Sequence, residues 1–268
     1  RNVVEDIANI ELRPTFVGIV DDSALGEDVV KKLKNHKVNT DYVMTMPGGM
    51  GTWLAVFDHN GDLAGSISQR PNLMPILGLL EKKGDEIFAN ADSVIVEVDM
   101  DKDIIKKVVA LAKQYNKKLY GVVSNMSIAV ERRDFLKHFD CFICNQLEAG
   151  MLFMEDYADK SPEELRDILS KRVILGKIPA MIVTMGGNGA VYADVNGEKG
   201  ICPPQRVRVK DTTGAGDAFC AGVASGLTYG KTLSEAVEIG SRLAASVITL
   251  SENVCPRFLP EEFGITLD

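Results

Sequence analysis

The chain is short of aromatic residues, which make up 6% of its 268 residues, and it contains one tryptophan. No apolar run approaches the ~18 residues that a membrane span requires, and the first residues do not form a signal peptide, so we expect no membrane partner. Basic residues are in the minority. The net charge of −8 disfavours a protein dedicated to nucleic acid, because an acidic surface repels phosphates.

Cysteine is also scarce, and its count of five is odd. Such a set fits reduced thiols better than a framework of disulfides, so we expect a cytoplasmic protein. Cys141 and Cys144 have the spacing of half a zinc site, but no second pair of this kind follows. We therefore predict that both are small, buried apolar residues of a strand.

Two patterns alternate along the chain. Short runs rich in β-branched residues predict buried strands, and between them apolar residues recur at the spacing of amphipathic helices, as in 101–116 and 232–250. Ser161 and Pro162 have the features of a capped helix start. This alternation predicts an α/β protein with a largely parallel sheet and helices on both faces. The runs that predict strands are 16–20, 93–98, 119–123 and 181–184.

Residues 40–70 break this alternation. The runs 53–57 and 63–67 predict a β-hairpin that turns through Asn60-Gly61, a pair that tolerates the positive φ angles of a type I′ turn. No helical pattern covers these strands, so we expect a small β-lid on the α/β body. Because the chain has no repeats and no proline-rich linker, we expect a single domain over 1–268, with the lid at about 40–70.

The most informative feature is the glycine-rich run Asp211–Asp217, which a helical pattern follows. Its small residues leave room for backbone N–H groups to converge on an anion at a helix N-terminus, where the macrodipole adds attraction. Asp217 by itself could be an acidic residue that favours a first turn. A carboxylate beside an anion-binding loop, however, supplies a base and donors for phosphoryl transfer. The chain has neither a P-loop sequence nor a dinucleotide-binding glycine motif after its first strand.

The nine residues Asp211–Phe219 resemble, letter for letter, the C-terminal signature of the ribokinase-type (PfkB) carbohydrate kinases. Asn145–Glu148 is similar to the N-x-x-E motif of that family, and Thr184–Gly189 is similar to its T-x-G-x-x-G nucleotide motif. The resemblance implies a three-layer α/β/α ribokinase-like sandwich with a mostly parallel central sheet and a small β-sheet lid. It also implies an ATP-dependent kinase whose acceptor is an alcohol.

The same resemblance assigns roles in the transfer step. Asp217 would be the catalytic base that takes the proton of the acceptor hydroxyl. Asp211 and Thr213 would belong to a monovalent-cation site, with K⁺ as the candidate ion. The anion hole for the γ-phosphoryl group would consist of the backbone amides of Gly214, Ala215 and Gly216.

Two further motifs would serve the nucleotide and its metal. Asn145 and Glu148 would organise Mg²⁺ and the phosphates, Glu148 through metal-bound water, because Mg²⁺ sheds water reluctantly. Taken without the family, this pair could be a solvated strand end, and the glycines of the nucleotide motif a tight turn. The residues that would flank the ATP tail are Thr184, Gly186, Gly187 and Gly189.

Three stretches favour the pseudouridine-kinase branch of the family. Arg1–Asp6 resembles its R-N-x-A-E-N run, 51–63 resembles its lid hairpin, and Ser251–Pro256 resembles its S-E-x-T-V-x-P ending. In that branch Asn2 would hydrogen-bond the ribose hydroxyls. We therefore predict phosphorylation of the 5′-hydroxyl of pseudouridine. The alternatives are a ribokinase, fructokinase or other nucleoside kinase, and a non-catalytic regulator that binds a sugar or a nucleotide.

The chain departs from the family pattern at its start. The first strand, the sugar-binding aspartate and the glycine pair of the family would precede Arg1, so we expect that the sequence is a trimmed form. The predicted lid strands have open edges that invite pairing with a second copy. This favours a homodimer formed through the lid.

Overall fold

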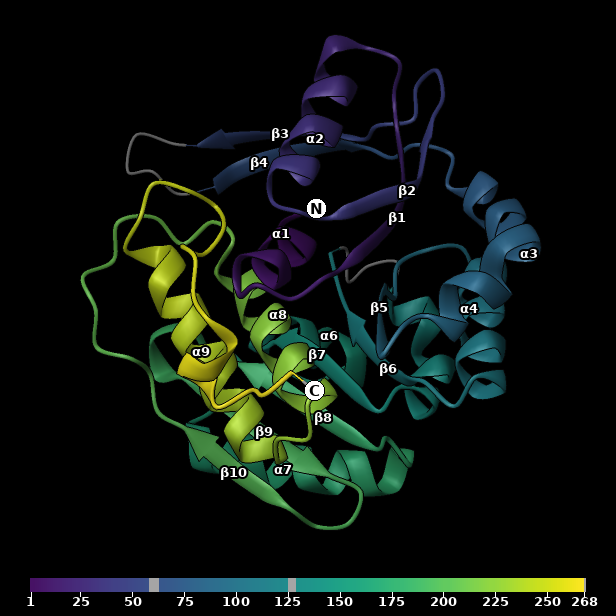
Figure 1. The fold of residues 1–268 in the computed structure, drawn as a ribbon. Coiled ribbons are helices and arrows are strands. Elements are labelled where there is room, and N and C mark those ends of the chain that lie inside the picture. The colour runs from purple at the N-terminus through teal and green to yellow at the C-terminus, as the bar shows by residue number, and fades with distance from the viewer. Residues whose placement is uncertain (58–62, 125–128, 268) are drawn as a thin grey trace.

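A computed structural model describes residues 1–57, 63–124 and 129–267 (Figure 1). Within these ranges six strands pair into one central sheet in the order β10-β9-β8-β7-β6-β5. In this sheet β5, β6, β7 and β8 run parallel to one another. Strands β9 and β10 form an antiparallel hairpin at one edge, and β9 pairs antiparallel with β8. Their bounds are β5 (Ser93–Glu97), β6 (Lys118–Val122), β7 (Cys141–Asn145), β8 (Ala180–Thr184), β9 (Ala190–Asp194) and β10 (Lys199–Cys202).

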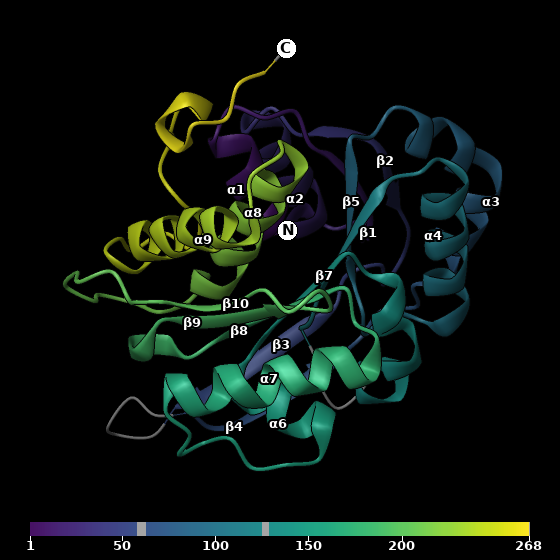
Figure 2. The same ribbon diagram turned by 90° about the horizontal axis from the view of Figure 1, so that it is seen from below.

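Helices cover both faces of this sheet, as Figure 2 shows for α6 and α7 on one side and α8 and α9 on the other. Alternate side chains of a strand enter different cores: Phe142 and Cys144 pack toward one layer, Cys141 and Ile143 toward the other. The three-layer α/β/α fold is therefore confirmed, and both cysteines are buried in a strand, as predicted. One layer contains α3 (Met74–Ala89), α4 (Lys102–Gln114), α6 (Gln146–Phe153) and α7 (Pro162–Gly176); the other contains α8 (Ala215–Thr228) and α9 (Leu233–Ile248).

Local sequence signals explain where the helices begin. Ser161 caps α7, its side chain accepting the Glu164 amide while the Glu164 carboxylate accepts the Ser161 amide. Thr232 and Glu235 form the same capping box at the start of α9. The predicted helices in 101–116 and 232–250 are thus confirmed. Short 3₁₀ segments complete the described structure: η1 (Val130–His138), η2 (Gly186–Asn188) and η3 (Pro260–Phe263).

The predicted lid hairpin is present. Strands β3 (Thr52–Phe57) and β4 (Leu63–Gln69) pair antiparallel, with Leu54 opposite Ile67. The predicted turn at Asn60-Gly61 lies outside the described residues.

The run 16–20 is a strand, but it differs from the expectation of a buried one. β1 (Thr15–Val20) pairs in parallel with β2 (Asn39–Thr45) in a separate two-stranded sheet, and only Gly18 and Val20 are buried along it. A run of β-branched residues favours an extended backbone, but which strand it pairs with depends on long-range packing.

The first helix lies between the lid side of the molecule and the sandwich (Figure 1). α1 (Asn2–Asn9) packs Val4 and Ala8 against Leu33 of α2 (Ala24–Asn35), and the residue after it, Ile10, joins the apolar cluster of α8 and α9. This position brings the start of α1 to the N-terminus of α8. None of the helices in the described ranges is both long and apolar enough to cross a membrane.

Candidate active site

The predicted anion loop precedes α8, and Gly214 is the N-cap of that helix. Gly214 has a φ of +85°, a left-handed conformation that favours glycine. Its α-carbon also faces the Asn253 carbonyl oxygen so closely that a Cβ would overlap it. Both conditions demand glycine, and the loop is thereby packed onto the segment that follows α9.

Asp217 lies in the first turn of α8 and is half-buried. Its Oδ2 accepts a hydrogen bond of 2.8 Å from Nδ2 of Asn2. Arg1 donates to Oδ1 of Asn2 at 3.1 Å, which turns the Asn2 amide group so that its nitrogen faces Asp217. The structure therefore brings the predicted base and the predicted substrate-binding residue into direct contact. Oδ1 of Asp217 accepts no hydrogen bond from any described residue.

The three predicted anion-hole amides are not equivalent. The Ala215 amide donates to the Thr212 carbonyl oxygen at 3.2 Å. Over the described ranges, the amides of Gly214 and Gly216 have no hydrogen-bond partner, as is usual at the start of a helix. Two N–H groups beside Asp217 are thus available to an anion without breaking a bond.

Asp211 and Thr213 contact each other within the loop. Oδ1 of Asp211 accepts the Thr213 amide at 2.8 Å, and this hydrogen bond lowers the pKa of the exposed Asp211 carboxyl. The contact fixes the loop just before Gly214. It also leaves an ionised oxygen at the surface of the loop.

Asn145 and Glu148 form a capping box at the start of α6. Asn145 Oδ1 accepts the Glu148 amide at 2.8 Å, and Glu148 Oε2 accepts the Asn145 amide at 2.7 Å. Desolvation raises the pKa of Glu148, and the hydrogen bond from Asn145 partly offsets that rise. The alternative interpretation, a solvated strand end, describes Asn145, which is exposed, but not Glu148, which is half-buried.

Thr184 is the register partner of Asn145, so both lie where the parallel strands β7 and β8 end. The turn after Thr184 is tight: Gly189, with a φ of +86°, has its carbonyl bonded by the Met185 amide at 2.7 Å. Gly186 and Gly187 are exposed in this turn. The glycines therefore do form a tight turn, at the sheet edge where ligands of parallel α/β proteins bind.

Cys220 of α8 is influenced by carboxylates of both the anion loop and the capping box of α6. Desolvation raises the pKa of the Cys220 thiol, and the negative charges of Asp217 and Glu148 add to this rise. Both carboxylates therefore lie within electrostatic reach of one side chain. No direct contact links the turn at 184–189 to Asp217 in the part of the chain that the structure describes.

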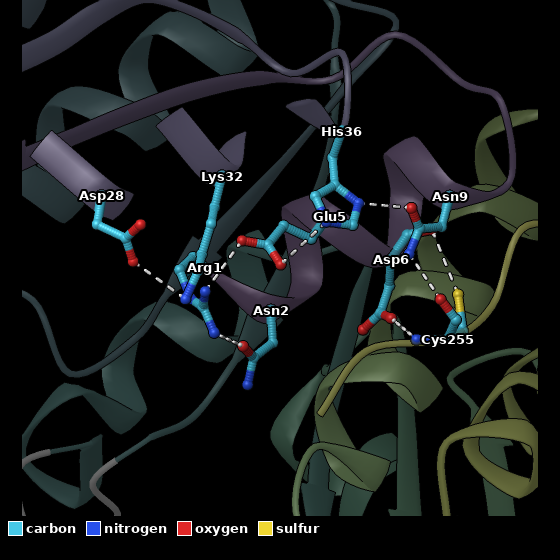
Figure 3. A network of polar contacts seen from close by, with 9 residues as sticks. All are labelled: Arg1, Asn2, Glu5, Asp6, Asn9, Asp28, Lys32, His36 and Cys255. Atoms are coloured by element: carbon cyan, nitrogen blue, oxygen red, sulfur yellow. Dashed lines mark hydrogen bonds and ion pairs between the residues drawn. The ribbon is translucent and has the colours of Figure 1, made fainter. Parts of the chain in front are cut away.

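Helix α1 supplies polar side chains that are not among the predicted site residues (Figure 3). Asp6 and Asn9 are buried, and both hydrogen-bond the backbone of Cys255, at 2.6 Å each. His36 contacts Oδ1 of Asn9 at 2.7 Å. A signal was present in the sequence, because Asn2, Asp6 and Asn9 share one helix face at the spacing i, i+4, i+7.

A second unpredicted group lies at the end of β5. Asp99 is buried, and Arg70 contacts it through an ion pair of 3.4 Å and a hydrogen bond of 3.0 Å to its carbonyl oxygen. Burial and the neighbouring Glu97 raise the pKa of Asp99, and Arg70 lowers it. Because Arg70 directly follows β4, this pair ties the lid to the central sheet.

The chain is similar in sequence to known kinases. A family model described as "pfkB family carbohydrate kinase" matches residues 1–254. The chain is 33% identical to a guanosine-inosine kinase from Exiguobacterium acetylicum over 257 residues, which cover 94% of this chain and 83% of the relative. It is 22% identical to the pseudouridine kinase of Escherichia coli K12, covering 93% of this chain and 78% of that enzyme.

A solved structure has the same fold over the full chain. The ribokinase of Arabidopsis thaliana, complexed with ribose and ATP, superposes with a TM-score of 0.81 at 18% identity, and the match covers 100% of this chain and 86% of that one. At this identity the likeness shows the fold alone.

Proposed function

The chain belongs to the PfkB family of carbohydrate kinases, and from this premise we propose that it transfers the γ-phosphoryl group of ATP to the 5′-hydroxyl of a nucleoside. It is a phosphotransferase that acts on a hydroxyl of a sugar or nucleoside. The finer choice of a nucleoside is the proposal. The contact between Asn2 and Asp217 supports a ribose at this site, and the two relatives named for nucleosides favour a nucleoside over the free sugar. In such a site Asn2 binds the ribose, and Asp217 takes the proton of the hydroxyl that is phosphorylated.

In the proposed reaction Asp217 holds the acceptor hydroxyl through Oδ1, because Oδ2 is engaged by Asn2. The hydroxyl oxygen attacks the γ-phosphorus, the bond from phosphorus to the ADP oxygen breaks, and the proton passes to Asp217. A carboxylate suffices as base, because the hydroxyl becomes acidic only as its bond to phosphorus forms. The amides of Gly214 and Gly216 donate to the transferred group, whose charge they stabilise.

Enzymes of this family use ATP and, in general, Mg²⁺. The residues present fit that ion: Asn145 and Glu148 offer the hard oxygen donors that Mg²⁺ prefers, and Glu148 is a desolvated carboxylate without a basic partner among the described residues. When bound, the ion neutralises charge on the phosphates. We propose that Glu148 contacts it through water and that Thr184, Gly186, Gly187 and Gly189 flank the ATP tail.

We further propose that Asp211 and Thr213 contribute to a site for a monovalent cation such as K⁺. The ionised, exposed carboxylate of Asp211, which stays charged because the Thr213 amide lowers its pKa, supports this assignment. The cation would fix the loop that precedes Gly214.

For the acceptor we propose guanosine and inosine in first place, because the 33% identical relative is named for these two nucleosides. Pseudouridine, the substrate that the sequence predicts, is the second candidate. It is favoured by the runs Arg1–Asp6 and Ser251–Pro256 and by the relative of 22% identity. Both candidates present a ribose to Asn2 and differ in the base.

A panel of acceptors tests these proposals. Guanosine, inosine, adenosine, pseudouridine, uridine, ribose and fructose are offered with ATP and Mg²⁺, and ADP formation is measured by a coupled assay. We expect kcat/KM for guanosine or inosine to exceed that for ribose by at least about 100-fold, because the base adds contacts that ribose lacks. Phosphorus NMR of the product should show a 5′-phosphate.

Other outcomes have definite meanings. Turnover of ribose or fructose without turnover of any nucleoside would refute the nucleoside assignment in favour of a sugar kinase. Turnover of pseudouridine alone would select the second candidate. Binding of ATP and nucleoside without ADP formation would instead support the alternative of a non-catalytic regulator.

A further inference from the structure

The carboxyl of Asp6 has no role in the reaction proposed above, although it lies close to it. It is fully buried on α1, four residues after Asn2 and on the same face of that helix. Its Oδ1 accepts the Cys255 amide at 2.6 Å, while its Oδ2 has no hydrogen-bond partner within the described ranges (Figure 3). A buried carboxyl with one unused oxygen is costly and needs an explanation.

Asp6 is one of two α1 side chains that hold the backbone of Cys255. The Cys255 carbonyl oxygen accepts Nδ2 of Asn9 at 2.6 Å, and the Cys255 thiol points to the Asp6 carbonyl oxygen at 3.7 Å. The amide, carbonyl and side chain of this residue are thus all bound to α1. The segment around Cys255 cannot shift along α1 without breaking these bonds.

This segment in turn supports the anion loop. The Asn253 carbonyl oxygen lies against the α-carbon of Gly214, at a distance that only glycine allows. The loop is also tied to the end of α9, because the Lys210 amide donates to the Ile248 carbonyl oxygen at 2.8 Å. A displacement of residues 253–255 would therefore move Gly214 and the amides that follow it.

We propose that Asp6 is a positioning residue for phosphoryl transfer, an inference that rests on the proposed kinase function. Through Cys255 and Asn253 it fixes the anion loop. The helix that carries it also carries Asn2, which fixes Asp217. Helix α1 thereby holds both the side chain of Asp217 and the segment against which the anion loop packs.

The electrostatics of Asp6 support a role other than stability. Burial raises the pKa of Asp6 to about 7, the hydrogen bonds with Cys255 oppose the rise, and the charges of Asp217 and Glu5 add to it. Among the described residues, the thiols of Cys220 on α8 and of Cys255 are also titratable groups near Asp6, whose charge adds to the rise in the pKa of each. Because the pKa is higher in the folded than in the unfolded chain, the free energy of unfolding falls as pH rises from about 4 to about 7. Asp6 thus costs stability at neutral pH.

Three variants test the inference: Asp6→Ala, Asp6→Asn, and Asp140→Asn as a matched control. Asp140 also accepts a backbone amide, that of Leu119 at 2.9 Å, but at the amino-terminal edge of the central sheet. We expect Asp6→Ala to lower kcat roughly 10- to 100-fold, the effect of a small misplacement, with KM for ATP nearly unchanged. The hydrogen-bonded loop amides of Thr213 and Ala215 should exchange with deuterium faster in Asp6→Ala but not in Asp140→Asn.

The conservative variant Asp6→Asn distinguishes the effect of the hydrogen bond to Cys255 from the effect of the negative charge. Asparagine can still accept the Cys255 amide, so Asp6→Asn should restore kcat to within about threefold of the wild-type value at pH 6. Its melting temperature should exceed that of the wild type by a few degrees at pH 8 and by less at pH 5, because it removes a buried charge. In the wild type, kcat should rise between pH 6 and 8 as Asp6 ionises and its hydrogen bond strengthens, and this rise should vanish in Asp6→Asn.

The results can overturn the inference separately from the function. If the wild type is active and Asp6→Ala matches it in kcat and in the exchange of the Thr213 and Ala215 amides, Asp6 does not position the loop. An Asp6→Asn variant with a kcat as low as that of Asp6→Ala would also refute the inference. If Asp6→Ala does not fold, the pH profile decides: a rise of kcat between pH 6 and 8 that persists in Asp6→Asn refutes the inference. A wild type that transfers phosphate to none of the acceptors would refute the proposed function, and the exchange experiment would still test the link from Asp6 to the loop.

Discussion

Asn2 and Asp217 are 215 positions apart in the sequence, and their side chains meet at 2.8 Å. An acidic residue in the first turn of a helix is common, because the carboxylate stabilises the helix dipole. Asp103 of α4 is such a residue: it is exposed, and its carboxylate contacts Lys106 of the same helix. Asp217 differs, since its partner comes from another helix and two unpaired amides lie beside it. These differences favour a base over a helix cap.

Replacing Asp217 with asparagine tests this assignment. We expect kcat to fall about 10²- to 10⁴-fold, because asparagine cannot take a proton from the acceptor hydroxyl. The dissociation constant for ATP, measured by calorimetry, should stay within a few-fold of the wild-type value. Asp103→Asn is the control and should leave kcat unaltered. Undiminished turnover in Asp217→Asn would exclude this carboxylate as the base.

The functional role of a residue could be predicted where the motif that contains it is a short run of the sequence. The anion loop and Asp217 are contiguous in the chain, so their association could be predicted before any fold was known. The contact of Asp6 with Cys255 could not be predicted, because these residues are separated by 249 positions. Each lies in a stretch that resembles a family motif, but neither motif indicates the other as its partner. The polar face of α1 indicated that this helix contacts polar groups. Which groups these are became clear only from the position of the helix in the fold.

Among the elements, the start of α8 is where backbone geometry limits the sequence most. Gly214 combines a left-handed φ with an approach to Asn253 that leaves no room for a side chain. A helix whose first turn must also receive an anion cannot be capped by a large side chain at this point. The glycine therefore serves the packing of the loop as well as its opening to a ligand.

Gly214→Ala should be damaging for these reasons. We expect a loss of about 1–3 kcal/mol in the free energy of unfolding, since alanine is strained at positive φ and would push Asn253 away. The kcat value should fall with it, because Asn253 and the loop amides would shift. Both can be measured by urea denaturation and by the ADP assay.

The matched control is Gly78→Ala in α3. No atom lies near the place of its Cβ, and its φ is not positive. Alanine in a helix interior should stabilise the protein by about 0.5–1 kcal/mol. If both substitutions proved equally harmless, the strain attributed to Gly214 would be wrong.

The lid hairpin and the capped helices were predicted with good boundaries because their determinants are short-range. The capping box of α7 and the alternation of β3 and β4 are contained in a few consecutive residues. The pairing of β1 could not be predicted in this way. Its partner β2 lies more than 20 residues away, and nothing in either run specifies the other.

At the scale of the whole molecule, the lid hairpin presents an unusual surface. Leu54, Val56 and Ile67 are more than half exposed, and the cross-strand pairing of Leu54 with Ile67 places them on one face. Neighbouring exposed apolar residues on a two-stranded sheet are typical of a surface that binds a partner. We propose that a second copy of the chain covers it, which is the predicted homodimer through the lid.

Sedimentation velocity of the full chain tests this proposal. We expect the wild type to be a dimer and Ile67→Asp to shift it toward monomer, because a charge would be buried without a partner. Leu175→Asp, at an exposed leucine of α7, is the control and should leave the dimer intact. A monomeric wild type at micromolar concentration, or a dimer insensitive to Ile67→Asp, would contradict assembly through the lid.

The family, the α/β alternation, the lid hairpin and the loop that carries Asp217 could all be predicted from the amino-acid sequence, because each depends on residues close together in the chain. The packing of α1 against α8 and the hydrogen bonds of Asp6 and Asn9 with Cys255 could be learned from the tertiary structure alone. Such contacts depend on how helices pack across the sheet. Packing is governed by the complementary shapes of surfaces distant in sequence, and no short run of residues encodes it.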